Sequence, residues 1–238
     1  MIKRTLFLFF FYFGVIFVCI LFLPALILPK KITLYGGRIL GFWSKFCLEL
    51  FLSTKIVIKG KEKILKNEKF FIASAHQSQF ETFFLQYLFN SPVFILKKEL
   101  LKIPIFGWYL KKIGSISIER NKVSRENIDF IDRIKASVSK YNRPLVIFPQ
   151  GTRHEFSERP QFKKGASRIY EELKIKCLPV AINSGSVWPK NGRLSKNKTL
   201  TISILKPIEA GKESKIFLEN LQKIIYEELD NISNPSSA

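Results

Sequence analysis

Cysteine and histidine are both scarce in this chain of 238 residues, which has three cysteines and two histidines. Cys19, Cys47 and Cys177 are odd in number and form no C-x-x-C or Cys/His pattern, which argues against a disulfide framework and a zinc site. This usage fits a reducing, cytosolic environment. His76 and His154 have no partner at an H-x-x-x-H type spacing, so we expect no metal at either.

Acidic residues are also few. There are 19 Asp and Glu against 39 Lys and Arg, which gives a net charge of +20. Such an excess favours an anionic partner: lipid headgroups, a phosphorylated substrate or nucleic acid. The sequence contains no RNP-like, helix-turn-helix or zinc-finger pattern, so we expect no nucleic-acid partner. The length suits one catalytic-sized domain, or one domain and an anchor.

Charge is absent altogether from Leu6 to Leu28, a run of 23 residues. A helix of this length would be roughly 34 Å long and would cross a hydrocarbon core of about 30 Å. A cleaved secretory signal is the alternative, but the run is longer than a usual signal and no small-x-small cleavage site follows it. Lysine or arginine lies on both sides, at residues 3–4 and 30–31, so orientation is weakly specified and a half-inserted helical hairpin stays open.

A second helix is indicated by apolar side chains at three- and four-residue steps over residues 38–53. The pattern fits an amphipathic helix on a bilayer and, equally, a helix that faces a protein core. We therefore expect membrane-anchoring helices over residues 1–54, with an apolar segment at 6–28 and an amphipathic one at 38–53. A folded domain over residues 55–230 and a frayed tail over 231–238 complete the expected organisation.

Short runs of β-branched and aromatic residues alternate with helical patterns after residue 55. This alternation predicts an α/β fold with a mainly parallel central sheet flanked by helices and preceded by the anchor. The expected strands lie at 55–60, 70–75, 92–97, 115–119, 144–149, 177–182 and 199–205. The expected helices lie at 80–89, 103–111, 123–141, 166–173 and 214–229.

The stretch AHQSQFET, residues 75–82, lies where an expected strand ends and a helix begins. Sites form at such junctions in open α/β sheets. His76 would stand at the carboxyl edge of the strand, and the first helical turn would bring Glu81 back toward it. Histidine is the natural proton acceptor near neutral pH, and a carboxylate on its other nitrogen would fix the tautomer. Ser78 is a rival nucleophile, but it lies in no G-x-S-x-G elbow.

Two further stretches carry candidate anion-binding groups. One strand ends in Glu119 and Arg120, and VIFPQGTRHE, residues 146–155, places Gly151, Thr152 and Arg153 after a hydrophobic strand. A flexible glycine lets backbone amides approach an anion, and a guanidinium binds phosphate bidentately. The alternative is that both arginines are solvated loop cations and that Gly151 only forms a turn.

These stretches, together with CLPVAINSG at residues 177–185, resemble the glycerophospholipid acyltransferase family, and most of all its lysophosphatidate acyltransferases. The family's histidine and acidic residue, with four residues between them, match His76 and Glu81. Its Gly-x-Ile-x-Ile-acid-Arg run matches residues 114–120, its Phe-Pro-Glu-Gly-Thr-Arg block matches residues 148–153, and its apolar strand with a central proline matches LPVAI. Two departures are Glu81 in place of Asp and Gln150 in place of Glu.

The resemblance implies transfer of an acyl group from a thioester to the sn-2 hydroxyl of lysophosphatidate. His76 would be the general base and Glu81 its partner. The phosphate would be held by Arg120, Gly151, Thr152 and Arg153, with Glu119, Pro149 and Gln150 in support. No metal or cofactor is expected; the donor would be acyl-CoA or acyl carrier protein, and the domain would lie at the cytoplasmic face of a membrane. Alternatives are another acceptor, such as glycerol 3-phosphate or another lysolipid, and a noncatalytic protein that binds anionic lipid.

Overall fold

The computed structural model describes residues 2–119 and 129–233, and the chain divides into two compact units. Unit 1 consists of Met1–Cys47 and Thr82–Leu145, and unit 2 consists of Leu48–Glu81 and Val146–Ala238. The chain passes between the units within helix α2 (Lys30–Leu52), helix α3 (Phe80–Leu88) and strand β5 (Leu145–Ile147). The stretches that carry His76, Glu81 and residues 148–154 therefore all belong to unit 2.

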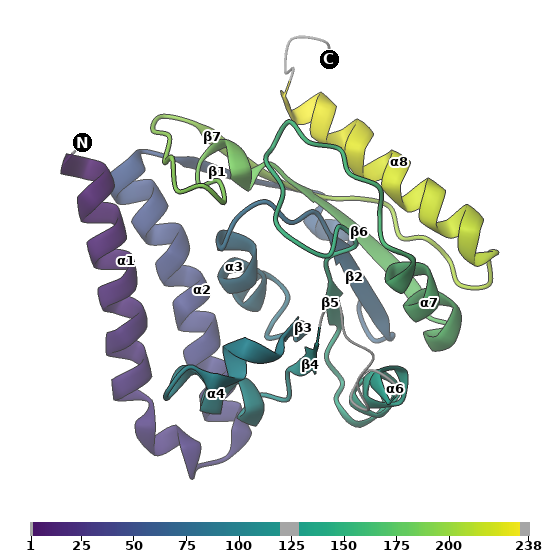
Figure 1. The fold of residues 1–238 in the computed structure, drawn as a ribbon, viewed down its shortest axis with the longest axis horizontal. Coiled ribbons are helices and arrows are strands. Elements are labelled where there is room, and N and C mark those ends of the chain that lie inside the picture. Colours follow the sequence, from purple (N-terminus) through teal and green to yellow (C-terminus); the bar gives the residue numbers. More distant parts are fainter. Residues whose placement is uncertain (1, 120–128, 234–238) are drawn as a thin grey trace. The chain divides into compact units, whose positions relative to one another are not determined.

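Unit 1 begins with a helical hairpin, drawn in purple and blue in Figure 1. Helix α1 (Ile2–Leu21) leads through the short 3-10 helix η1 (Leu23–Leu26) into α2. Pro24 lies in the first turn of η1, where its missing N–H costs no helical hydrogen bond. The Trp43 indole Nε1 donates to the Phe10 carbonyl over 3.2 Å and ties the two long helices together.

Helix α1 is largely exposed and apolar. Within the described residues, it is the one helix that is long and apolar enough to cross a membrane. The uncharged run predicted as one segment over 6–28 is divided, because α1 ends at Leu21 and η1 follows. The amphipathic helix predicted for 38–53 begins at Lys30 instead and ends at Leu52. Gly36 lies inside this helix. A Cβ atom added at Gly36 would come within 2.9 Å of the Phe22 ring, so the hairpin requires glycine at this position or an adjustment of the ring.

The rest of unit 1 holds strands β3 (Val93–Lys97) and β4 (Ile116–Ile118), the short helix η3 (Lys98–Lys102) and helices α4 (Phe106–Lys112) and α6 (Phe130–Lys140). The two strands pair in parallel, with Ile95 opposite Ile116. The Tyr109 hydroxyl donates to the Cys19 carbonyl and Lys112 Nζ to the Leu26 carbonyl, both over 2.7 Å, which joins α4 to the hairpin. The predicted helix 123–141 lies partly outside the described residues, and its described part is α6.

Unit 2 contains a sheet with the strand order β1-β7-β6-β2-β5. Strands β1 (Lys55–Lys59) and β7 (Thr199–Ile204) pair in parallel, as do β2 (Phe70–Ser74) and β6 (Lys176–Ile182), while β6 and β7 are antiparallel. All five residues of β2 are buried, which a sheet covered on both faces requires. The α/β fold with a mainly parallel sheet is confirmed, and all seven predicted strands are present.

Helices α7 (Lys164–Leu173) and α8 (Ser214–Ser233) lie side by side in unit 2 (Figure 1). The rings of Tyr170 and Phe217 stack with centroids 3.7 Å apart, and Phe71 of β2 packs against both. All three side chains are buried. This aromatic cluster holds β2 in place through Phe71, and His76 follows two residues after the end of β2.

Helix α8 extends to Ser233, beyond the predicted end at residue 229, and the Ser233 hydroxyl donates to the Leu229 carbonyl over 2.7 Å in this last turn. Of the predicted tail, residues 234–238 lie outside the described residues. The predicted division into anchoring helices over 1–54 and a domain over 55–230 stays a prediction.

Candidate active site

His76 stands just beyond the carboxyl end of β2, and three hydrogen bonds fix the backbone there. Ala75 N donates to the Val180 carbonyl over 3.0 Å and extends the pairing of β2 with β6. His76 N donates to Oε1 of Gln150 over 2.6 Å, and the His76 carbonyl accepts from His154 N over 3.0 Å. The histidine is thus held on both sides by the loop that follows β5.

The imidazole of His76 stacks on the ring of Phe148, with centroids 4.0 Å apart and planes 16° apart. Its Nδ1 lies 3.7 Å from Oε2 of Glu81 and is buried without a hydrogen-bond partner. The distance is too long for a hydrogen bond, but catalytic contacts often tighten only when substrate binds. Because Nδ1 faces the carboxylate, Nε2 is the nitrogen left for a substrate proton.

The Glu81 carboxylate is fully buried and anchored at both oxygens. Oε1 accepts from Gln77 N and Ser78 N, Oε2 accepts from Ser78 N, and each of these three distances is 3.0 Å. The Ser184 hydroxyl adds a short hydrogen bond to Oε1. Backbone amides in the turn before a helix are natural anion donors, so the turn that begins α3 orients the carboxylate. Ser78 has a structural part in this turn, since its buried hydroxyl accepts from Phe80 N.

Gln150 links His76 to helix α8. Its Oε1 accepts from His76 N, and its side chain lies near the Tyr226 hydroxyl, which donates to the Pro160 carbonyl. Burial raises the pKa of Tyr226 to about 12, and Gln150 and Arg159 lower it in part. The Gln150 side chain is buried. A neutral amide accepts the hydrogen bond from His76 N without burying a charge, which suits Gln in place of Glu in this chain.

The loop after β5 turns sharply at Gly151, which has φ +77°. Gly151 N donates to the Phe148 carbonyl over 2.9 Å, and Lys163 N donates to the Pro149 carbonyl over 2.8 Å. The Gly151 amide is thus engaged within the turn. Thr152 is exposed, and within the described part of the chain the half-exposed Arg153 guanidinium has no hydrogen-bond or ion-pair partner. The Arg153 guanidinium therefore has hydrogen-bond donors that the described residues do not use.

The structure gathers most of the predicted site residues in unit 2: His76, Glu81, Pro149, Gln150, Gly151, Thr152 and Arg153. Glu119 belongs to unit 1, where its Oε1 lies 2.9 Å from Lys98 Nζ. Arg120 lies outside the described residues. His154 is a loop residue whose Nδ1 contacts Glu158 over 2.8 Å, and this hydrogen bond lowers the pKa of Glu158. Among described residues, no group of three or more His, Cys, Asp or Glu is placed to hold a metal ion.

The contacts that Phe148, Gln77 and Ser184 make at the site were not predicted from the sequence. Phe148 forms the face on which the imidazole stacks, and Gln77 Oε1 accepts from Gly185 N over 3.0 Å. Ser184 lies close to Glu81 because strands β2 and β6 are parallel neighbours, with Ser74 opposite Val180, so the segments just beyond their carboxyl ends meet at one edge of the sheet. This strand order is known only from the fold.

Comparisons with known proteins identify a family. The family model described as Acyltransferase matches residues 55–183. A 1-acyl-sn-glycerol-3-phosphate acyltransferase of Saccharomyces cerevisiae is 32% identical over 193 residues, which cover 77% of this chain and 63% of the relative. A protein of the same name from Pseudomonas aeruginosa is 32% identical over 156 residues, 63% of this chain and 59% of the relative. The chain thus spans about three-fifths of the length of these two curated relatives.

Among solved structures, the 1-acyl-sn-glycerophosphate (LPA) acyltransferase PlsC from Thermotoga maritima has a similar fold. The TM-score is 0.78, the sequence identity is 19%, and the match covers 97% of both chains. This likeness supports the α/β architecture with its N-terminal hairpin. The family model spans more than half of the sequence and includes His76, Glu81, residues 114–120 and 148–153 and the LPVAI strand, so this chain belongs to the acyltransferase family.

Proposed function

We propose that this chain transfers an acyl group from an acyl thioester to the sn-2 hydroxyl of lysophosphatidate and so forms phosphatidate. The observation that carries the proposal is the pairing of His76 Nδ1 with the fully buried, fourfold hydrogen-bonded carboxylate of Glu81. Membership of the acyltransferase family and the printed names of the relatives support the choice of reaction and acceptor.

In the proposed reaction, His76 Nε2 takes the proton of the substrate hydroxyl as the oxygen attacks the thioester carbonyl. Glu81 stabilises the imidazolium that forms, because its carboxylate faces Nδ1. When the tetrahedral intermediate collapses, the C–O ester bond remains, the C–S bond breaks, and the thiolate leaves and recovers a proton from His76. The nucleophile is the hydroxyl of the substrate itself, so no acyl-enzyme is needed.

Arg153 is the proposed ligand of the substrate phosphate, with the Thr152 amide beside it. The role assigned to Arg120 falls on a residue outside those the structure describes and stays a prediction. A guanidinium that binds phosphate bidentately would place the hydroxyl near His76, and this gain comes from orientation more than from activation. The turn at Gly151 sets the direction of the loop that carries Arg153.

Membrane attachment suits this reaction, because acceptor and product are lipids and α1 is apolar and exposed. We propose that the catalytic unit works at the cytoplasmic face, with acyl-CoA or acyl carrier protein as donor and with no cofactor. The net charge of +20 favours both an anionic membrane surface and an acidic carrier.

The decisive experiment supplies the purified full chain with lysophosphatidate and a labelled acyl thioester. Wild type should form phosphatidate, and His76→Ala should lose about three orders of magnitude of kcat, within the range of about 10²–10⁴ for general-base catalysis. Glu81→Ala should also be impaired. His154→Ala is the matched control and should retain activity, because that side chain contacts Glu158 in a loop.

Two further arms of this experiment address the acceptor and the donor. Glycerol 3-phosphate and other lysolipids compete with lysophosphatidate for the labelled acyl group, and acyl-CoA is compared with acyl carrier protein. If wild type binds anionic lipid but forms no acylated product with any pair, the protein is a noncatalytic lipid binder and the proposal fails.

A further inference from the structure

Three cationic side chains converge on one tyrosine ring in unit 1. Lys30 Nζ lies 3.6 Å from the centroid of the Tyr141 ring, Arg143 Cζ lies 5.1 Å from it and Lys140 Nζ lies 5.5 Å from it. They come from the start of α2, the end of α6 and the segment that follows α6. We refer to Lys30, Lys140, Tyr141 and Arg143 as the Tyr141 cluster. The electron-rich ring face attracts each cation, but it supplies no full negative charge.

The cluster has no acidic counterpart among the described residues. Lys30 Nζ and the Nε and Nη1 atoms of Arg143 are buried and make no hydrogen bond, while Nη2 of Arg143 donates to the Ile113 carbonyl over 2.7 Å. Burial lowers the pKa of Lys30, the interaction with Tyr141 raises it in part, and the charges of Arg143 and Lys140 lower it further. Burial also lowers the pKa of Arg143. Like charges this close, with donors unused, are unfavourable unless an anion from outside joins them.

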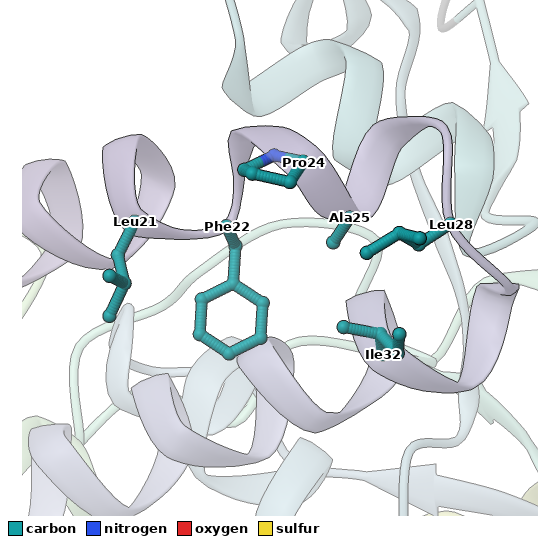
Figure 2. Close-up of a pocket in the computed structure, with 6 residues that line it drawn as sticks. All are labelled: Leu21, Phe22, Pro24, Ala25, Leu28 and Ile32. Carbon is teal, nitrogen blue, oxygen red and sulfur yellow. The ribbon is translucent and has the colours of Figure 1, made fainter.

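The surroundings of Lys30 indicate where this anion comes from. Lys30 follows the apolar turn between α1 and α2, in which Ile27 is 90% exposed. An open hollow of about 260 Å³ on this turn is lined only by apolar side chains, which Figure 2 shows: Leu21, Phe22, Pro24, Ala25, Leu28 and Ile32. Such a turn fits the hydrocarbon side of a bilayer surface, so a cation beside it lies at the level of the lipid headgroups.

We propose that the Tyr141 cluster binds the phosphate of an anionic phospholipid headgroup. Exposed Lys140 meets the phosphate first, and Lys30 and Arg143 supply the donors that lack a partner within the protein. Tyr141 holds the three cations near one another while the site is empty. These residues are not those proposed for acyl transfer, so the two sites can be tested separately.

The test is native mass spectrometry of the purified full chain in a neutral detergent, titrated with phosphatidylglycerol and, in parallel, with zwitterionic phosphatidylcholine. Wild type should bind one phosphatidylglycerol molecule more tightly than phosphatidylcholine. Lys30→Gln and Arg143→Gln should each weaken phosphatidylglycerol binding about fivefold, as expected from about 1 kcal/mol per basic residue near an anionic surface. Lys215→Gln removes one exposed charge from α8 and should change nothing.

Lys140→Gln tests the site in a variant that should fold normally, because Lys140 is exposed and its replacement leaves the packing intact. It should also weaken phosphatidylglycerol binding, and the circular dichroism spectrum should match that of wild type. Equal affinities for the two lipids, or unchanged binding in the Lys30→Gln/Lys140→Gln double variant, would overturn the proposal. Inorganic phosphate is added as a competitor. If millimolar phosphate displaces the lipid and binds with the same dependence on Lys30, the site serves free phosphate and the headgroup assignment is wrong.

Discussion

The Ser184 hydroxyl donates a hydrogen bond to Oε1 of Glu81, and the other oxygen of the same carboxylate lies 3.7 Å from His76 Nδ1. Ser184 and Glu81, which are 103 positions apart in the sequence, are thus joined by a hydrogen bond inside the protein. The remaining donors to the carboxylate are backbone amides of Gln77 and Ser78, which no side-chain substitution removes. Ser184 is therefore the point at which the orientation of Glu81 can be tested without changing its charge.

We expect Ser184→Ala to lower kcat about tenfold and the free energy of unfolding by about 1.5–3 kcal/mol, the usual contribution of a hydrogen bond to a charged group. The reason is that one oxygen of a buried carboxylate loses its side-chain donor. Steady-state acyl transfer and urea unfolding measure the two effects. Ser186→Ala is the control, because the Ser186 hydroxyl donates only to the Asn183 carbonyl. Equal effects of the two substitutions would show that Ser184 does not orient Glu81.

Gln150 offers a second test, in which the glutamate usual in the family is restored. A carboxylate at position 150 still accepts from His76 N, but it places a negative charge near the Tyr226 oxygen, whose proton is donated to the Pro160 carbonyl. We expect Gln150→Glu to lower the free energy of unfolding by about 1–3 kcal/mol, since a charge is buried beside a second oxygen. Chemical denaturation followed by circular dichroism measures the change.

A double-mutant cycle with Tyr226→Phe separates this effect from general damage. Removal of the Tyr226 oxygen abolishes this contact, so Gln150→Glu should be less harmful in the Tyr226→Phe background, with an interaction energy of about 0.5–3 kcal/mol. Strict additivity of the two substitutions would mean that Gln150 and Tyr226 do not act on each other.

Much of the fold was predictable because its signals are local. A buried strand such as residues 70–74 must be a continuous apolar run, and the alternation of such runs with helices predicted all seven strands. The start of α2 was not predictable in this way. The amphipathic pattern begins at residue 38, whereas the helix begins at Lys30, and its first part includes Gly36, beside which the Phe22 ring from the preceding turn lies.

The same distinction holds at the candidate site. The pairing of His76 with Glu81 depends on one turn between a strand and a helix, so the spacing alone predicted it. Ser184 and Tyr226 come from segments far along the chain, and their contacts depend on the order of the strands and on the packing of α8. Tertiary contacts of this kind leave no periodic trace in the sequence, which is why the departure at Gln150 had no explanation before the fold was known.

Cys177 gives a prediction about chemical reactivity. Burial raises the pKa of its thiol well above the usual value. Cys177 belongs to β6, and its side chain is fully buried. A raised pKa means that less thiolate is present at any pH below it, and the thiolate is the reactive species. Iodoacetamide at pH 8 should therefore leave Cys177 unmodified in the folded protein and modify it after unfolding in guanidinium, as peptide mass spectrometry can determine. Labelling of Cys177 at equal rates in both states would contradict its burial.

The loop that carries Arg153 depends on Gly151, and a second glycine provides the control. Gly151 and Gly192 have φ values of +77° and +76°, so alanine is strained by about 1–2 kcal/mol at both positions. Only at Gly151 does an added methyl group meet another residue, Lys163 Cγ at 3.3 Å, since nothing lies within 4 Å at Gly192. Gly151→Ala should therefore displace the loop and raise the KM for lysophosphatidate, whereas Gly192→Ala should lower the free energy of unfolding and leave KM unchanged. Equal KM values for the two variants would show that the direction of this turn does not control how Arg153 meets the substrate phosphate.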